Sequence, residues 1–315
     1  MKIAILDAAT LGDDIDLSLF DSFGEVSVYR TTEPSLIPER ISDCDVCIIN
    51  KVRLNSENLG SARALKLICV AATGYDNIDT EYCRNNGIAV CNVAGYSTNS
   101  VSQLTLAMVL SASVNLNAFA KSVADGSYTN GGVQNILTPV YHELAGKVWG
   151  IVGYGGIGKK VGLAAKALGC RVVVNKRTPI EDEECLSLHE LLKISDIVTV
   201  HVPLTDKTRG MIGSEELRMM KDGAFLVNVA RGAVTDEQAV ADAVLSGKLG
   251  FFGCDVYSAE PMSESHPFQK IKSLPNVCLT PHMAWGAYEA RERCMREIKE
   301  NIISFINGET RNRIV

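Results

Sequence analysis

The 315-residue sequence has no apolar run that approaches the roughly 20 residues needed to span a bilayer. It also has no excess of positive charge, because 31 Lys and Arg residues stand against 37 Asp and Glu residues, for a formal net charge of −6. Nucleic acids and anionic membrane surfaces favour basic partners. The composition therefore argues against a nucleic-acid or membrane partner, although a local basic cluster could still bind a small anion.

The N-terminus lacks the apolar segment of a secretory signal peptide. One lysine is followed by only four apolar residues, 3–6, before the acid Asp7. A signal peptide needs about 7 to 15 apolar residues at this point. The segment instead predicts a first strand, and we expect a cytoplasmic protein.

Complete metal-binding patterns are missing despite ten cysteines. Cys44 and Cys47 form a C-x-x-C pair, but no second pair and no neighbouring histidine pair completes a zinc site. Others, such as Cys69 and Cys278, lie within apolar, strand-like runs, where a free cysteine behaves as a small hydrophobic residue. We therefore expect structural thiols and no metal.

The length and the 46% hydrophobic content are typical of a globular chain with about two domains. Short apolar runs alternate with longer segments of helical period, as in parallel sheets covered by helices. Two such series predict two α/β units. The strands expected in the first are residues 3–6, 26–29, 46–50, 67–71 and 88–91. Those expected in the second are residues 148–152, 171–174, 197–200, 224–229, 250–255 and 277–280.

The segments between and after the strands predict helices and one long connection. Residues 54–65 separate two strands of the first series, and residues 97–117 predict one long helix between the two series. Residues 287–306 predict a final helix, which could belong to either unit or cross back to the first one. Residues 125–141 are rich in Gly, Asn and Thr, and they predict a loop or an oligomer arm.

A glycine-rich loop follows the first strand of the second series and opens a helix. This strand–loop–helix context is what the dinucleotide-binding fingerprint G-x-G-x-x-G requires. Gly153 would permit the tight turn, Gly155 would let the backbone approach the pyrophosphate, and Gly158 would allow close packing of helix on strand. The alternative is a glycine-rich turn that binds no ligand, but such a turn would not need a strand before it and a helix after it. The loop residues expected to bind the cofactor are Gly153, Tyr154, Gly155, Gly156, Ile157 and Gly158.

The end of the next strand predicts which dinucleotide is bound. Enzymes that use NAD carry an Asp or Glu there, which binds the ribose 2′-hydroxyl. Here the strand ends in Asn175, Lys176 and Arg177, and Lys176 stands where the acid would be. Two cations suit a 2′-phosphate, so we expect NADP(H), with NAD(H) possible. Alternatively, this is a solvated strand end with incidental cations.

Three polar residues follow different strands of the second series, at the edge where open α/β sheets bind ligands: Arg231, Glu260 and His282. Hydride transfer to a carbonyl leaves negative charge on its oxygen, so a proton donor is needed, and histidine titrates in the right range. A carboxylate orients such an imidazole and favours its protonated form. A guanidinium can hold a substrate carboxylate through two bonds. The trio predicts reduction of a 2-oxo acid.

Each member of the trio also has a structural interpretation. The histidine could be hydrogen-bonded only for packing, and the glutamate could be a solvated loop acid. Arg231 could pair with a nearby acid, Asp236 or Glu237. His201 competes as the proton donor, but it ends an earlier strand and is better suited to line the cofactor site. The other histidines, 142, 189 and 266, are interpreted as structural or surface residues.

The sequence resembles the D-isomer-specific 2-hydroxyacid dehydrogenases over nearly its whole length. The resemblance lies in a series of segments that follow one another in order and at similar spacing: residues 71–79, 153–158, 201–204, 228–232, 255–261 and 281–282. It implies an acid/base role for His282, with Glu260 as its partner and Arg231 binding substrate. It also implies that the backbone around Thr73 and Gly74 holds the substrate carboxylate. Further cofactor contacts are then expected at His201, Val202, Pro203, Val229, Ala230, Asp255 and His282.

The resemblance also implies the domain plan and a narrower activity. A substrate domain of residues 1–98 and 287–315 would be interrupted by an NAD(P)-binding Rossmann domain of residues 99–286, and two copies would form a homodimer. Within the family, residues 95–103 and 282–291 are most similar to glycerate dehydrogenases, also called hydroxypyruvate reductases. Trp285 would then wall the substrate pocket, although it could equally be a packing aromatic.

The sequence therefore predicts the reversible reduction of hydroxypyruvate or glyoxylate to the D-2-hydroxy acid. One alternative keeps the reaction and changes the substrate to a phosphoglycerate-type or bulkier acid. Another is a dinucleotide-sensing regulatory protein, but the chain has no basic tail that would support nucleic-acid contact.

Overall fold

The computed structural model describes residues 1–178 and 180–315. They form two compact units, Met1–Ser97 with Gly286–Val315, and Thr98–Trp285. Each unit is built on one parallel sheet with helices on its faces, and the second unit interrupts the sequence of the first. The predicted fold class, two doubly wound α/β domains of which one is inserted into the other, is thereby confirmed.

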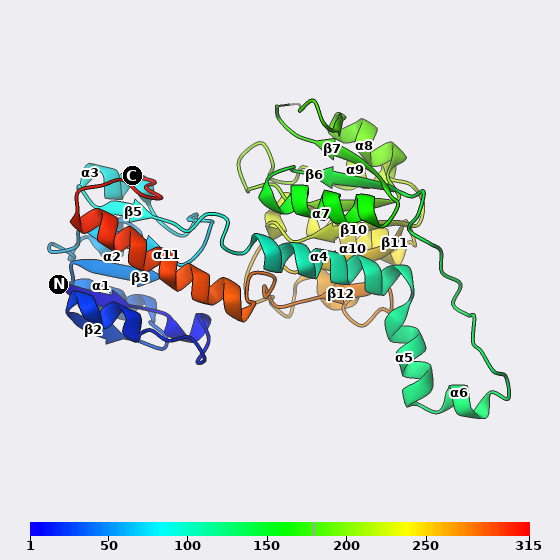
Figure 1. The fold of residues 1–315 in the computed structure, drawn as a ribbon, viewed down its shortest axis with the longest axis horizontal. Helices are drawn as coiled ribbons and strands as arrows, with labels where there is room; N and C mark the ends of the chain where they lie inside the picture. The colour runs from blue at the N-terminus through cyan, green and yellow to red at the C-terminus, as the bar shows by residue number, and fades with distance from the viewer. Residues whose placement is uncertain (179) are drawn as a thin grey trace. The chain divides into compact units, whose positions relative to one another are not determined.

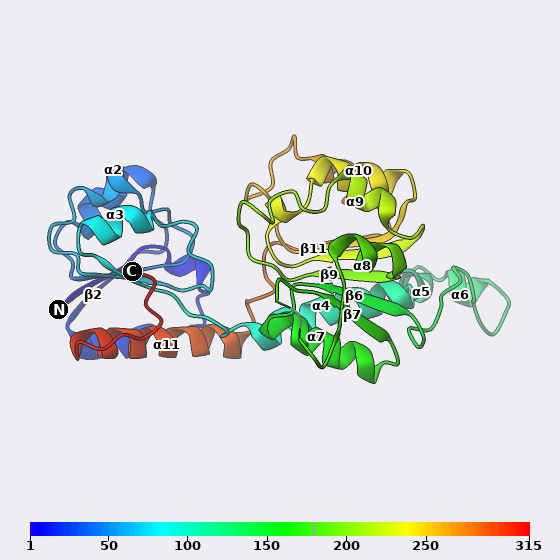
Figure 2. The same ribbon diagram turned by 90° about the horizontal axis from the view of Figure 1, so that it is seen from above.

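The first unit contains a five-stranded sheet with the strand order β2-β1-β3-β4-β5. The helix α11 (Tyr288–Ile306) lies on the face of this sheet opposite α2 (Ser56–Leu59) and α3 (Thr80–Asn85) (Figure 2). Of the places left open for the final helix, the structure selects the first unit. Its strands are β1 (Lys2–Ile5), β2 (Glu25–Val28), β3 (Val46–Ile49), β4 (Leu67–Val70) and β5 (Ala89–Cys91).

The second unit contains a seven-stranded sheet with the strand order β12-β11-β10-β9-β6-β7-β8. The strand order reverses between β6 and β9, because the chain leaves β6 for β7 on one side and later returns to β9 on the other. Ligands of such sheets bind at this point, outside the carboxyl ends of the strands. The strands are β6 (Val148–Val152), β7 (Arg171–Asn175), β8 (Glu184–Cys185), β9 (Ile197–Val200), β10 (Ala224–Asn228), β11 (Leu249–Cys254) and β12 (Val277–Leu279).

Helices cover both faces of the second sheet (Figures 1 and 2). One face carries α4 (Thr98–Ser113) and α7 (Gly156–Ala167), and its core includes the fully buried Trp149. The other face carries the remaining helices of the sheet: α8 (Leu188–Ile194), α9 (Ser214–Met219) and α10 (Glu237–Leu245). The strand β8 was not expected, because two residues are too few to produce a recognisable pattern.

The long helix predicted for residues 97–117 is confirmed as α4, but its predicted end was wrong. The helix α4 ends at Ser113, and α5 (Leu116–Ala124) starts beyond Asn115, whose φ of 51° is left-handed. An asparagine tolerates this conformation better than most residues, so a local pattern of apolar residues did not reveal the break. The predicted connection 125–141 contains one short helix, α6 (Ser127–Asn130). Together α5, α6 and the following chain extend beyond the sheet (Figure 1).

Among the described residues, no single helix is both long and apolar enough to cross a membrane. Only α4 and α5 taken together meet that test, and they are bent by 65° at the break between them.

All ten cysteines are free thiols, of which eight are buried and two half-buried. Burial raises the pKa of the Cys44 thiol to about 12 and that of Cys83 to about 11. No group of three or more His, Cys, Asp or Glu in the described part of the chain is arranged to hold a metal ion.

Candidate active site

The glycine-rich loop connects β6 to α7 at the point where the strand order reverses. Gly153 has a φ of 93°, and a side chain there would meet the backbone carbonyl carbon of His201 at 2.7 Å. A Cβ at Gly158 would meet the carbonyl oxygen of Gly153 at 2.2 Å. Both positions therefore need glycine, the first for its left-handed turn and the second for the close approach of helix and loop.

Gly155 is different, because a Cβ built there has nothing within 4 Å. The residue lies immediately before the first turn of α7, a helix of twelve residues whose N-terminal N–H groups face away from the helix body. An open backbone surface at the positive end of a helix suits a phosphate. The loop thus fits the pyrophosphate of a dinucleotide, as its spacing predicts.

The end of β7 lies beside this loop. The carbonyl oxygen of Asn175 accepts a hydrogen bond from the Gly153 N–H at 2.9 Å, and the Asn175 side chain donates to the carbonyl oxygen of Leu186. The next two side chains, Lys176 and Arg177, are exposed. In residues 1–178 and 180–315, neither forms an ion pair with an acid of this chain. Both cations are therefore available to an anion.

A buried carboxylate connects the loop to the segment that follows β7. The Tyr154 hydroxyl donates to Glu183 Oε1 at 2.6 Å, and Lys166 on α7 contacts both Glu183 oxygens at 2.7 and 2.8 Å. Burial would raise the pKa of Glu183, but the bonds from Lys166 and Tyr154 outweigh it and lower the pKa. Sequence reasoning assigned Tyr154 to the cofactor site but did not find its partner.

His201 follows β9, the strand next to β6. Both of its ring nitrogens are buried, although other parts of the residue are exposed, and neither has a hydrogen-bond partner among the described residues. Burial lowers the pKa of this imidazole to about 3. His201 is therefore neutral near pH 7, which removes it as a competing proton donor. The following Val202 lies against Gly153, and Pro203 continues the same loop.

The buried residues Val229 and Ala230 continue β10 and lead to Arg231. The fully buried Asn228 holds this turn at both ends, because its side-chain oxygen accepts from the Ala230 N–H and its amide donates to the Arg231 carbonyl. The Arg231 guanidinium donates to the Ala230 carbonyl at 2.8 Å and is half-buried.

The acids proposed as alternative partners of Arg231 are occupied. Asp236 accepts the Ala239 N–H and caps α10, while Glu237 accepts two hydrogen bonds from Ser258. Both acids thus hold backbone or side-chain groups of neighbouring turns.

The central pair of the site is His282 with Glu260. The Nδ1 atom of His282 lies 2.6 Å from Oε2 of Glu260, and the two side chains are 21% and 30% exposed, so solvent still reaches them. The second oxygen of Glu260 accepts the N–H of Tyr257 at 3.0 Å. A histidine that was hydrogen-bonded only for packing would not need a carboxylate fixed in this way.

Asp255 holds the turn that carries His282. It is fully buried, and it accepts the Thr280 hydroxyl at 2.6 Å and the N–H groups of Met283 and Ala284, each at 2.8 Å. Burial raises the pKa of Asp255, and these three bonds partly offset the rise. His282 itself has a φ of 53°, which the bonds on either side stabilise. Asp255 was predicted as a cofactor contact, and its observed bonds position the turn of the histidine.

All these residues follow strands of one parallel sheet, so they gather at its carboxyl edge. Trp285 is partly buried and packs against the core cluster that includes Met108 and Trp149. Thr73 and Gly74 belong to the first unit, in the turn after β4. There the Thr73 hydroxyl donates to the carbonyl of Val93 at 2.9 Å.

Sequence reasoning missed the contacts of Asn228, Thr280 and Glu237. Each lies within a few residues of a residue that was predicted, so the segment was found but the bond was not. For Asn228 and Thr280 the available signal was a small polar residue at the end of an apolar strand, and for Glu237 it was an acid in the first turn of a helix.

The comparisons with known proteins agree with this geometry. Residues 106–284 match the family model described as D-isomer specific 2-hydroxyacid dehydrogenase, NAD binding domain. A glycerate dehydrogenase of Methylorubrum extorquens is 33% identical over 99% of this chain and 98% of its own length. A hydroxypyruvate reductase of Blautia hydrogenotrophica is 34% identical over 98% of both chains.

A solved structure extends the likeness to the fold. The D-lactate dehydrogenase of Aquifex aeolicus, solved with NAD and lactic acid, is 28% identical and superimposes with a TM-score of 0.85 over 98% of this chain and 96% of its own. The family match covers more than half of the chain, and the two relatives cover nearly all of it. The chain is therefore a member of the D-isomer specific 2-hydroxyacid dehydrogenase family, and it is an oxidoreductase that acts on 2-hydroxy and 2-oxo acids.

Proposed function

We propose that this enzyme reduces a short 2-oxo acid, hydroxypyruvate or glyoxylate, reversibly to the D-2-hydroxy acid, with His282 as the general acid/base. The observation that carries the proposal is the 2.6 Å contact of His282 with Glu260, at the same sheet edge as the glycine-rich loop. The two relatives named for glycerate and hydroxypyruvate support the choice of substrate.

The chemistry follows from the roles these side chains can take. Nδ1 of His282 contacts Glu260, so we assign the transfer of a proton to the substrate carbonyl oxygen to the other ring nitrogen, Nε2. Glu260 stabilises the imidazolium form and keeps the ring in one orientation. Arg231 would bind the substrate carboxylate through two parallel bonds, as guanidinium groups do. A nicotinamide cofactor, when bound at Gly153–Gly158, supplies the hydride in reduction and accepts it in oxidation.

The remaining substrate contacts rest on the resemblance to the family. The backbone N–H groups of Thr73 and Gly74 would hold the substrate carboxylate, and Trp285 would limit the size of the substrate side chain. A phosphoglycerate-type or bulkier acid remains the alternative substrate. No observation favours a dinucleotide sensor over an enzyme.

For the cofactor we propose NADP(H), with NAD(H) as the alternative. The support is the exposed pair Lys176 and Arg177 after β7, where an acid would bind the ribose 2′-hydroxyl of NAD. Initial rates with hydroxypyruvate, glyoxylate and pyruvate, each with NADPH and with NADH, test both proposals together. Activity with pyruvate but with neither hydroxypyruvate nor glyoxylate would refute the substrate, and a preference for NADH would refute the cofactor.

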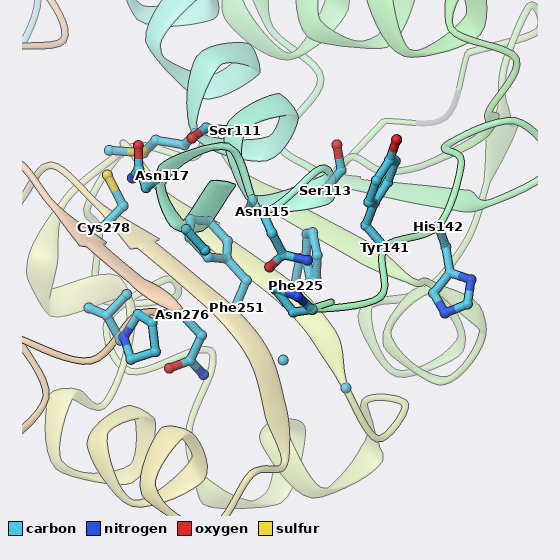
Figure 3. Close-up of a pocket in the computed structure, with 18 of the residues that line it drawn as sticks. Ser111, Ser113, Asn115, Asn117, Tyr141, His142, Phe225, Phe251, Asn276 and Cys278 are labelled. Atoms are coloured by element: carbon cyan, nitrogen blue, oxygen red, sulfur yellow. The ribbon is translucent and has the colours of Figure 1, made fainter. Parts of the chain in front are cut away.

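We also propose that the chain forms a homodimer. A groove of about 1110 Å³ lies at the amino ends of β10, β11 and β12, opposite the edge that carries the active-site residues. Figure 3 shows aromatic side chains from the sheet, Phe225 and Phe251, beside Asn115, which precedes α5, and Tyr141. The two phenylalanine rings lie 5.5 Å apart. This groove is therefore apolar at its base and is not the catalytic site.

The segment that borders the groove exposes an unusual number of apolar side chains. They are Leu116, Val123, Val133, Leu137, Val140 and Tyr141, all at least half exposed. Exposed apolar side chains and an apolar groove on one chain favour a second copy, because a two-fold axis lets each copy cover the other. The segment 116–141 is thus proposed as the dimer arm.

A further inference from the structure

A second histidine–glutamate pair lies beneath the turn that carries Glu260. Glu237 is the first residue of α10 and only a tenth of its side chain is exposed. Its Oε1 accepts the N–H of Ser258 at 2.7 Å, and its Oε2 accepts the Ser258 hydroxyl at 2.5 Å. Ser258 is two residues from Glu260, so one buried carboxylate fixes the backbone of this turn.

His266 completes the buried pair. Its Nδ1 accepts the N–H of Phe268 at 3.2 Å, so the ring proton must sit on Nε2. That Nε2 atom lies 3.0 Å from Oε2 of Glu237, too bent for a good hydrogen bond but close enough for electrostatic attraction. The His266 side chain is only 4% exposed. Burying two polar groups costs free energy unless they are paired, and this close contact offsets part of that cost.

Two further contacts fix the same turn. A Cβ at Gly232, the residue after Arg231, would meet the Ser258 nitrogen at 2.2 Å, so these backbones pack directly on each other. The Tyr257 hydroxyl donates to the Thr280 carbonyl at 2.9 Å. Residues 257–260 are therefore held from the Arg231 side, from the His282 side and, through Glu237, from His266.

We propose that Glu237 and His266 are positioning residues that set the contact between Glu260 and His282. Neither is proposed to touch substrate or cofactor; they act only through the turn that includes Ser258. This inference rests on the proposed acid/base role of His282. Without the Glu237–His266 pair, the turn would be looser and Glu260 could move away from the imidazole. The protonated form of His282 would then no longer be stabilised by the carboxylate.

Three variants test the proposal on the whole enzyme. His266→Asn keeps an acceptor for the Phe268 N–H but loses the ring nitrogen that faces Glu237. Glu237→Gln removes the charge while retaining the shape. Ser258→Ala removes a single hydrogen bond at an exposed residue. It tests the same contact if either buried variant fails to fold. The matched control is His189→Asn, because His189 contacts Glu216 at 3.3 Å on the surface and is half exposed.

The decisive readout is the pH profile of kcat/KM for reduction. Reduction needs protonated His282, so a weaker Glu260 contact should move the alkaline limb to lower pH, by roughly half a pH unit. We expect kcat to fall about tenfold, because small misplacements of catalytic groups are costly, with KM for the dinucleotide unchanged. Ser258→Ala should shift the limb in the same direction by less, and His189→Asn should leave it in place.

A second test separates positioning from simple loss of stability. In a Glu260→Gln background, adding His266→Asn or Glu237→Gln should cause no further shift, because both act through Glu260. Variants that melt at lower temperature but keep the wild-type pH profile would overturn the proposal. If His282→Gln retains normal turnover, the proposed function itself fails. If His282→Gln and Glu260→Gln are impaired while His266→Asn and Glu237→Gln are not, only this inference fails.

Discussion

Nδ1 of His282 lies 2.6 Å from Oε2 of Glu260, although the two residues are 22 positions apart and follow different strands, β12 and β11. The parallel sheet makes this contact possible, because it brings both strand ends to one edge. The buried Asp255 fixes one partner, and Glu237 fixes the turn of the other. The geometry of the His282–Glu260 pair is therefore fixed by the buried residues Asp255 and Glu237, which hold the two loops in place.

Removing the imidazole should abolish proton transfer. We expect His282→Gln to lower kcat at least about 100-fold, since a positioned acid contributes 10²–10⁴-fold, while the Kd for NADPH stays within about twofold. Glu260→Gln should lower kcat less and narrow the pH range of reduction. Stopped-flow and steady-state rates measure kcat, and fluorescence titration measures the Kd for the dinucleotide. His189→Gln is the control, and normal turnover of His282→Gln would refute the acid/base role.

Reversing the charge after β7 should reverse the cofactor preference. Lys176→Asp should raise KM for NADPH about 10- to 100-fold, because it removes a cation from the 2′-phosphate and supplies an acceptor for the 2′-hydroxyl of NADH. Arg177→Gln should act on NADPH alone. Lys272→Asp, an exposed charge reversal elsewhere in the second unit, is the control. Equal changes in KM for NADPH and NADH would mean that these cations do not bind the 2′-phosphate.

Stability should fall at mildly acidic pH because of His201. Burial lowers the pKa of its imidazole from the usual 6.5 to about 3. The unfolded chain then binds a proton below pH 6.5 that the folded chain binds only near pH 3, so stability decreases as the pH falls through this window. At pH 5 this single group should cost about 2 kcal/mol of the free energy of unfolding.

Urea unfolding without dinucleotide, at pH 7 and pH 5, measures that difference. His201→Leu should lose most of it, because the variant has no proton to bind, whereas the exposed His142→Leu should behave as the wild type does. The same pH dependence in His201→Leu and in the wild type would contradict the prediction.

Local patterns in the sequence predict much of this molecule. The turn requires glycine at 153 and the close packing requires it at 158, while Gly155 lies at the open backbone surface that its position in the motif predicts. All strands of the first sheet, and all but β8 of the second, were expected within about one residue. Such features depend on residues close in sequence, so spacing and alternation reveal them.

Contacts between distant segments are not predicted in this way. Nothing local links Glu237 to Ser258 or His266, and His266 had been interpreted only as structural or surface. The break at Asn115 is hidden for another reason, because the apolar positions of α4 and α5 continue one helical pattern across it. Long-range pairing and single left-handed residues require the folded chain.

The proposed dimer arm gives the last prediction. Leu137 and Val140 are 69% and 71% exposed, and burying such side chains against a second copy should contribute about 1.5–3 kcal/mol each. Leu137→Asp and Val140→Asp should therefore weaken self-association at least about tenfold, as measured by sedimentation equilibrium. Leu163→Asp on α7 is the matched control, because Leu163 is 59% exposed but lies away from the groove. A wild-type chain that stays monomeric at all concentrations would refute the arm, and unaltered association of both arm variants would move the interface elsewhere.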